Sequence, residues 1–163
     1  KIAKRLPCQV GGGIRTAEQA KMLLEAGARR AILGSVLFGA SGVDTKTTEA
    51  LAAAIGREQF VASIDTKAGR VAVRGWKESV ELTPEQAMLS LEPYCGAFLY
   101  THVDTEGTMQ GFPFERARTL RSLTSRQLIV AGGIRERAEI DALDAIGVDA
   151  VAGMAVYTGL LAT

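Results

Sequence analysis

The sequence contains few cysteines and no excess of charge of one sign. Its two cysteines, Cys8 and Cys95, stand far apart and belong to no metal-ligand spacing, so we expect reduced, packed thiols rather than a disulfide or a metal site. The chain carries 19 lysines and arginines against 18 aspartates and glutamates, which gives a formal net charge of +1. Nucleic acids and acidic membranes attract proteins through clustered positive charge, and these interleaved charges offer little of it. The balance therefore predicts neither kind of partner.

Long hydrophobic runs are also missing. No segment approaches the roughly twenty apolar residues that span a bilayer, and the first residues lack the charged, apolar and cleavage-site succession of a signal peptide. We therefore expect a soluble cytoplasmic protein. Its 163 residues, 47% of them hydrophobic, suit one core better than two, so residues 1–163 are predicted to form a single domain.

What the sequence does contain is an internal duplication. The tetrapeptide Gly12–Arg15 recurs, letter for letter, as Gly132–Arg135. The same interval separates each copy from a further glycine, Gly27 or Gly147, that would end a helix. An apolar run and another glycine follow in both copies. Each copy therefore predicts the succession of buried strand, glycine turn, helix, buried strand and glycine turn.

Apolar runs alternate with helical patterns along the chain, which is typical of parallel strand–helix units. Strands are predicted at Cys8–Val10, Ala31–Leu33, Phe60–Ile64, Ala97–Tyr100, Gln127–Ala131 and Ala150–Ala152. Helices are predicted between them at Ala17–Ala26, Lys46–Ile55, Pro84–Tyr94, Phe114–Leu123 and Ala138–Ile146. Residues 1–6 are typical of the end of a further helix.

Units of this kind close into an eight-stranded barrel or spread into a doubly wound sheet. The twofold repeat favours the barrel, because a barrel places equivalent turns on opposite sides of one mouth. We therefore predict an α/β fold of the TIM (β/α)8-barrel type, in a partial form with about six units. Six strands leave two apolar edges unpaired, so we expect a homo-oligomer, strand exchange or a complementing chain to cover them.

The repeated glycines indicate anion binding. Backbone N–H groups hold a phosphate only where the main chain approaches it closely, and a following helix N-terminus adds a favourable partial charge. The predicted first cradle consists of Gly12, Gly13, Arg15, Gly34 and Ser35, and the predicted second cradle of Gly132, Gly133, Gly153 and Met154. Tight turns without a ligand would explain a single glycine pair, but two matching pairs favour phosphate. Two cradles predict a ligand with two anionic ends.

One acidic residue stands where a catalytic group is expected. Asp65 follows the apolar strand Phe60–Ile64, and a partly buried carboxyl group at a strand end can act as a general acid or base. Capping of a turn is the alternative role for such an aspartate. Thr101 ends the next strand, where its hydroxyl could orient a substrate oxygen. The single histidine, His102, alternates with Thr101 and is predicted to face away from the site and pack.

A loop with an arginine and the only tryptophan follows Asp65. Arg74 and Trp76 come after a hairpin-like stretch, Gly69–Val73, and such a loop can close over a flat heterocycle and exclude water. Surface packing is the alternative role for the tryptophan. The sequence has no nucleoside-triphosphate loop, no complete dinucleotide fingerprint and no metal-ligand spacing, so it predicts neither a cofactor nor a metal.

Five motifs taken together resemble those of a known enzyme family, the phosphoribosylformimino-5-aminoimidazole carboxamide ribotide isomerases of histidine biosynthesis. In order along nearly the whole chain, they are Val10–Arg15, Ser63–Asp65, Arg74–Trp76, Thr101 with Gly107–Gly111, and Ala131–Ile134. The resemblance begins at the end of the family's second helix and continues through its eighth strand. It implies a TIM barrel built from two duplicated halves.

The resemblance also implies an activity, the Amadori rearrangement of an aminoaldose ribotide with a phosphate at each end to the aminoketose. It identifies Asp65 with the general acid that helps to open the ribose ring, and Thr101 with a threonine that assists. The two cradles would hold the two phosphates, while Arg74 and Trp76 would pack over the substrate. Two departures stand out. Glu106 occupies the place of a family aspartate, and the family's other catalytic aspartate lies on a first strand without a counterpart in this sequence.

Two other hypotheses stay open. The related cyclase of the same pathway shares the cradles and a strand-end aspartate, although the Arg74–Trp76 motif favours the isomerase. A noncatalytic phosphate-binding scaffold would keep the cradles and lose the chemistry.

Overall fold

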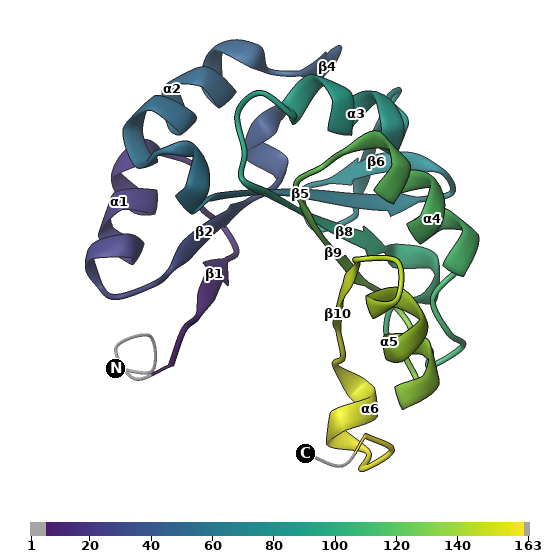
Figure 1. The fold of residues 1–163 in the computed structure, drawn as a ribbon. Coiled ribbons are helices and arrows are strands. Elements are labelled where there is room, and N and C mark those ends of the chain that lie inside the picture. The colour runs from purple at the N-terminus through teal and green to yellow at the C-terminus, as the bar shows by residue number, and fades with distance from the viewer. Residues whose placement is uncertain (1–5, 162–163) are drawn as a thin grey trace.

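The computed structural model describes residues 6–161 and contains one main sheet. Six of its strands are parallel: β1 (Gln9–Gly11), β2 (Arg30–Leu33), β5 (Phe60–Lys67), β8 (Ala97–His102), β9 (Gln127–Ala131) and β10 (Asp149–Val151). They are hydrogen-bonded in the order of the sequence, from β1 at one edge to β10 at the other. Figure 1 shows these strands bent into an open arc, with β1 and β10 on its two limbs.

Helices cover the outer side of this arc (Figure 1). They are α1 (Ala17–Glu25), α2 (Thr45–Ile55), α3 (Pro84–Leu91), α4 (Phe114–Leu123) and α5 (Arg137–Asp144). The short α6 (Met154–Tyr157) follows β10 at the end of its limb. The start of α3 is fixed by a capping box, in which Thr83 and Gln86 exchange backbone-to-side-chain hydrogen bonds and Pro84 fills the first helical position. Three short 3₁₀ helices lie in the connections: η1 (Ser35–Leu37) follows β2, η2 (Arg57–Gln59) precedes β5, and η3 (Val103–Thr105) follows β8.

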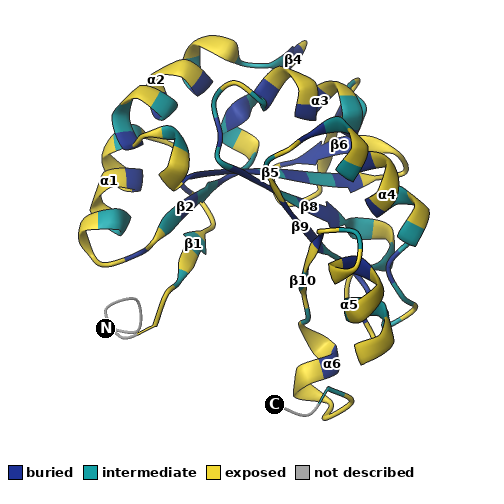
Figure 2. Cartoon of the chain, in the orientation of Figure 1, coloured by how far each residue is buried: buried dark blue, intermediate teal, exposed yellow. Residues whose placement is uncertain are grey.

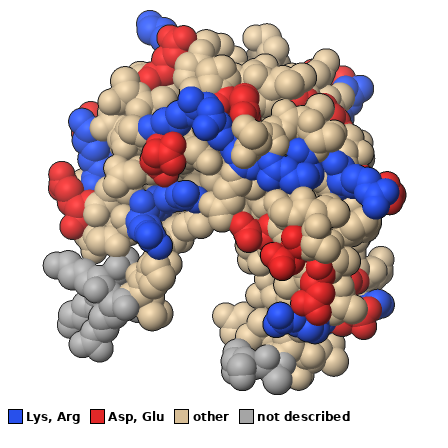
Figure 3. Space-filling view, in the orientation of Figure 1, with Lys and Arg blue, Asp and Glu red and all other residues tan. Residues whose placement is uncertain are grey.

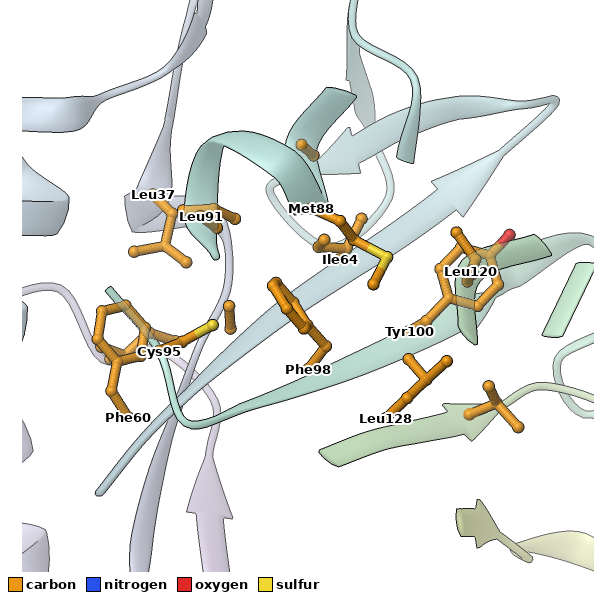
Figure 4. Close-up of a cluster of buried hydrophobic side chains, with 14 of the residues drawn as sticks. Leu37, Phe60, Ile64, Met88, Leu91, Cys95, Phe98, Tyr100, Leu120 and Leu128 are labelled. Carbon is orange, nitrogen blue, oxygen red and sulfur yellow. The ribbon is translucent and has the colours of Figure 1, made fainter. Parts of the chain in front are cut away.

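Large apolar side chains fill the space between the sheet and the outer helices. Figure 4 shows the most deeply buried of them, which include Phe60, Ile64, Met88, Leu91, Phe98, Tyr100 and Leu128. Burial of each such side chain contributes roughly 1.5–3 kcal/mol relative to leaving it exposed. Alternate residues of the same strands face the inside of the arc, where Ile32, Ser63 and Leu99 are only half-buried. The stabilising core therefore lies outside the sheet, and the inner face is available to a ligand.

The sequential strand order confirms the barrel-type prediction. A doubly wound sheet reverses its strand order at a switch point, and this sheet does not. The sequence predicts buried strands at both repeats, and this is wrong for β1 and β10. Within residues 6–161 each of them pairs on one side only, so both remain partly exposed. Figure 2 shows the contrast with β5, β8 and β9, which are largely dark blue.

Several boundaries differ from the predicted ones. β5 continues past Ile64 to Lys67, because it pairs there with an antiparallel hairpin made of β6 (Arg70–Val73) and β7 (Glu78–Val80). The last turn predicted for α3 is a non-helical turn that follows Leu91. A small two-stranded sheet, β3 (Phe38–Gly39) with β4 (Gly42–Val43), and helix α6 were not predicted. Apart from Leu6, the helix end predicted over residues 1–6 lies outside the described residues.

Residues 6–161 include no helix that combines the length and the hydrophobicity needed to cross a bilayer.

Both cysteines are free thiols, as predicted, and their surroundings differ. Cys95 is fully buried, whereas Cys8 is half-buried beside the edge strand β1. Burial raises the pKa of the Cys95 thiol to about 12. Because the thiolate is the reactive form, Cys95 is held in an unreactive state at neutral pH.

We expect DTNB, a reagent that reacts with accessible thiols, to label one cysteine in the native protein and two after denaturation. Cys8 should react in the native state, and Cys95 should react only when the chain unfolds. The Cys8→Ser variant is the control and should lose the native signal alone. Rapid native labelling of that variant would contradict the burial of Cys95.

Candidate active site

A cavity of about 860 Å³ opens at the carboxyl ends of the first three parallel strands. Its lining comes from three successive turns. Gly12, Gly13 and Arg15 follow β1, Gly34 and Ser35 follow β2, and Asp65 lies near the end of β5. Arg74 closes one side from the β6–β7 hairpin. Because parallel strands end at a common edge, segments far apart in the sequence meet here.

The first cradle presents open backbone to this cavity. Gly12 and Gly13 are exposed and have φ angles of 106° and 67°, a region that favours glycine. A Cβ atom built on either residue would meet no heavy atom within 4 Å. Helix α1 begins just beyond, where Thr16 accepts a hydrogen bond from the Gln19 N–H. An anion could therefore approach the main chain closely and face the positive end of a helix.

Asp65 projects into the same cavity and is half-buried. Its Oδ2 accepts a hydrogen bond of 2.8 Å from the indole Nε1–H of Trp76, and its Oδ1 accepts one of 3.3 Å from the Ser63 hydroxyl. These two donors fix the orientation of the carboxyl group. The sequence analysis missed Ser63, although its position two residues before Asp65 places both side chains on one face of β5.

The tip of the β6–β7 hairpin lies over the cavity. The Arg74 N–H donates to the Ser35 hydroxyl at 2.9 Å, and the Arg74 guanidinium pairs with Glu78 at 2.9 Å. Arg74, Gly75 and Trp76 have φ angles of 53°, 65° and 66°, so three successive residues adopt the left-handed region. That conformation is costly for the two residues with side chains. The hydrogen bonds to Ser35 and Asp65 stabilise the tip in this costly conformation.

Thr101 lies beside Asp65 on the neighbouring strand. The two residues are register partners in the parallel β5–β8 pair, so their side chains share the inner face. Thr101 is buried and is not part of the cavity lining. His102 faces the other way, as alternation predicts, and packs against Tyr100 and Phe112. Burial lowers the pKa of the His102 imidazole, which fits a packing role.

The second cradle surrounds a separate and smaller cavity of about 80 Å³. Gly132 and Gly133 line it together with Gly153, Met154 and Glu106. The two diglycines have similar backbones, with φ angles of 116° and 84° in the second. Their surroundings differ, however, because Gly132 and Gly133 are buried. The structure thus brings together the predicted members of each cradle and places Asp65 with the first.

Close packing against the β8–α4 connection explains the burial of the second diglycine. A Cβ atom on Gly132 would lie 2.4 Å from the His102 carbonyl oxygen, and one on Gly133 would lie 2.9 Å from the Gly111 carbonyl oxygen. The Thr105 hydroxyl donates to the Gly132 carbonyl at 3.0 Å. The same connection also holds the β5–β6 turn, since Asp104 accepts the Ala68 N–H at 3.0 Å. Glycine is thus required here by packing as well as by φ.

These contrasting environments predict unequal costs for one substitution. Gly12→Ala should lower the free energy of unfolding by about 1–2 kcal/mol, the cost of a left-handed conformation. Gly132→Ala carries the same cost plus overpacking of roughly 1–3 kcal/mol. Urea denaturation of both variants against the unaltered chain measures the difference. Equal losses would show that packing against His102 adds nothing.

Comparison with known proteins supports an origin in histidine biosynthesis. Residues 1–162 match the family described as histidine biosynthesis protein. Three relatives bear the name 1-(5-phosphoribosyl)-5-((5-phosphoribosylamino)methylideneamino)imidazole-4-carboxamide isomerase. The protein from Methanocaldococcus jannaschii is 35% identical over 96% of this chain, and that from Methanosphaera stadtmanae is 37% identical over 95%. The protein from Caldicellulosiruptor bescii is 35% identical over 99%.

The chain spans about two thirds of the length of these relatives, 65% of the first two and 67% of the third. Within that span, the match is continuous and includes both cradles and the Asp65 strand end. A family match over residues 1–162 and identities of 35–37% establish common descent. The chain therefore belongs to the family of histidine biosynthesis proteins.

Proposed function

We propose that the chain acts in the Amadori rearrangement of a bisphosphorylated aminoaldose ribotide to the aminoketose. The observation that carries the proposal is the shared cavity of Asp65 and the first cradle. This arrangement puts a carboxyl group within one site that also offers open backbone N–H groups to a phosphate. The relatives support it, because all three are named as isomerases of a compound with two phosphoribosyl groups.

In this proposal Asp65 supplies a proton at the start of the reaction. Transfer of that proton to the ribose ring oxygen breaks the bond between this oxygen and the anomeric carbon, and the ring opens. Thr101, its register partner on β8, assists by positioning the substrate oxygen. The Trp76 indole would exchange its hydrogen bond to Asp65 for contact with the flat face of the substrate.

The rearrangement also requires a base that removes a proton from carbon. The resemblance gives that role to an aspartate on a strand without a counterpart in residues 1–163. We propose that this base, with its strand, comes from polypeptide outside these residues. Asp65 then provides half of the proton-transfer pair.

The two cradles together would hold the two ends of the substrate. Gly12, Gly13, Gly34 and Ser35 bind one phosphate, and Gly132, Gly133, Gly153 and Met154 bind the other. The substrate class is therefore a small molecule with two phosphate groups. The alternatives are the related cyclase activity and a scaffold that binds phosphate without turnover. The names of the relatives favour the isomerase over the cyclase, and the open edges of the sheet are the feature that favours the scaffold.

Asp65→Asn tests the catalytic assignment. We expect at least about a hundredfold loss of turnover of the aminoaldose, the usual contribution of a general acid, with unchanged urea stability. The matched control is Asp141→Asn, which makes the same chemical change on the outer helix α5. A spectrophotometric assay of both variants measures the effect. All chains are assayed together with the polypeptide that supplies the base. Activity of Asp65→Asn within threefold of the unaltered chain would then refute the role, and phosphate binding without any turnover of that complete assembly would favour the scaffold.

Where no such polypeptide is bound, we also propose that a second copy of the chain covers the two strand edges that stay unpaired within residues 6–161. Unpaired N–H and C=O groups run along β1 and β10, and five exposed large apolar residues lie beside β10 at Val151, Met154, Val156, Tyr157 and Leu160. Exposed strand edges flanked by apolar surface favour association.

Sedimentation at micromolar concentration should therefore give a dimer or a larger species. Tyr157→Asp is expected to shift the population toward monomer, because it places a charge in the apolar surface. The matched control, Leu89→Asp, places the same charge at an exposed apolar residue of the outer helix α3 and should leave the mass unchanged. A compact monomer of the unaltered chain across the concentration range would rule out the second copy.

A further inference from the structure

The internal duplication allows the two cradles to be compared residue by residue, and several positions just after the shared tetrapeptide differ in charge. Gln19 in the first copy corresponds to Glu139 in the second. Each side chain accepts a hydrogen bond from the backbone N–H of the arginine that follows the diglycine. The distances are 2.7 Å from Arg15 to Gln19 and 2.8 Å from Arg135 to Glu139. The geometry is thus conserved between the halves, while the capping group is neutral in one and anionic in the other.

The two arginines also differ in their partners, because the second copy has Glu136 where the first has Thr16. The Arg135 guanidinium pairs with Glu136 at 2.9 Å and lies 3.8 Å from Glu139. It is absent from the lining of the second cavity. Arg15 lines the first cavity, and none of the ion pairs found within residues 6–161 involves it. One arginine is therefore free to meet an anion, and the other is held by carboxylates.

The remaining charges increase this asymmetry. The first cavity is lined by Arg15 and Arg74 against Asp65, whereas Glu106 is the charged residue lining the second. The first copy does carry an acid of its own, Glu18 in the first turn of α1, which is not part of the cavity lining. Figure 3 shows acidic side chains gathered on the limb that carries α5 and β10. A negative group beside a helix N-terminus opposes the anion that this terminus would otherwise attract.

Access differs in the same direction. Gly12 and Gly13 are exposed, whereas Gly132 and Gly133 are packed beneath the β8–α4 connection. A phosphate reaches the first diglycine without moving any other part of the described chain. At the second, the available space is about 80 Å³ against about 860 Å³.

We propose that the first cradle is the primary anion subsite, that the second binds weakly, and that Glu136 and Glu139 of the second copy, in place of Thr16 and Gln19, contribute to the difference. The inference rests on the proposed function, since it concerns the same two subsites. A ligand with a single phosphate, such as inorganic phosphate or ribose 5-phosphate, occupies the first cradle. A bisphosphorylated substrate is anchored there, and its other end is held loosely.

The test is a titration of the ¹⁵N-labelled chain with inorganic phosphate at constant ionic strength, followed through the amide signals of the four glycines of the two diglycines. In the unaltered chain we expect Gly12 and Gly13 to saturate at a phosphate concentration at least about tenfold lower than Gly132 and Gly133. Gln19→Glu should weaken the first subsite by roughly three- to tenfold, and Glu139→Gln should strengthen the second by a similar factor. Both changes exchange an amide and a carboxylate of the same shape.

Asp141→Asn is the control for net charge, because it removes one negative charge from α5 at a residue paired with Arg137 rather than Arg135. It should leave both subsites unchanged. Equal affinities in the unaltered chain, or a Glu139→Gln variant whose second subsite stays as weak as before, would overturn the inference and leave the proposed function intact. Absence of any shift at all four glycines would contradict the cradles themselves and with them the proposed function.

Discussion

Parallel pairing of strands in sequence order is the constraint on which the site depends. Each strand places its carboxyl end at the same edge of the sheet, so the turns that follow β1 and β2 meet the end of β5 around one cavity. The register of the β5–β8 pair sets Asp65 beside Thr101. The outer helices make this possible, because their apolar faces bury one side of the strands and leave the other side free.

The two copies of the duplication have the same backbone conformation at the diglycine but different surroundings. Both diglycines precede a helix, and all four glycines adopt positive φ angles. Only a residue without a Cβ atom adopts such angles at low cost. In the first half this conformation exposes main chain to a cavity. In the second it also lets the β8–α4 connection pack closely, so glycine is needed there for two reasons. Equal sequence motifs therefore do not imply equal binding properties.

The hairpin tip links access to the cavity with the state of the carboxyl group. Trp76 donates a hydrogen bond to Asp65, the residue proposed for proton transfer. The Arg74 backbone N–H donates one to Ser35, a residue proposed to bind phosphate. The left-handed residues of the tip are costly, and the contacts compensate for that cost. A bound substrate would take the place of these contacts. The hairpin tip would then leave Asp65 and Ser35 and pack over the substrate.

The sequence by itself determined the order of the six parallel strands and of helices α1 to α5 and the barrel-type fold, and it predicted the members of both cradles, because period, glycine placement and repetition are local signals. It also placed Asp65 at a strand end and turned His102 away from Thr101, since side chains alternate along a strand. Only the tertiary structure decided the rest. It joined Trp76 to Asp65 and separated an open cradle from a packed one. These features depend on which segments become neighbours across the sheet, and contacts between distant segments leave no periodic signal in the sequence.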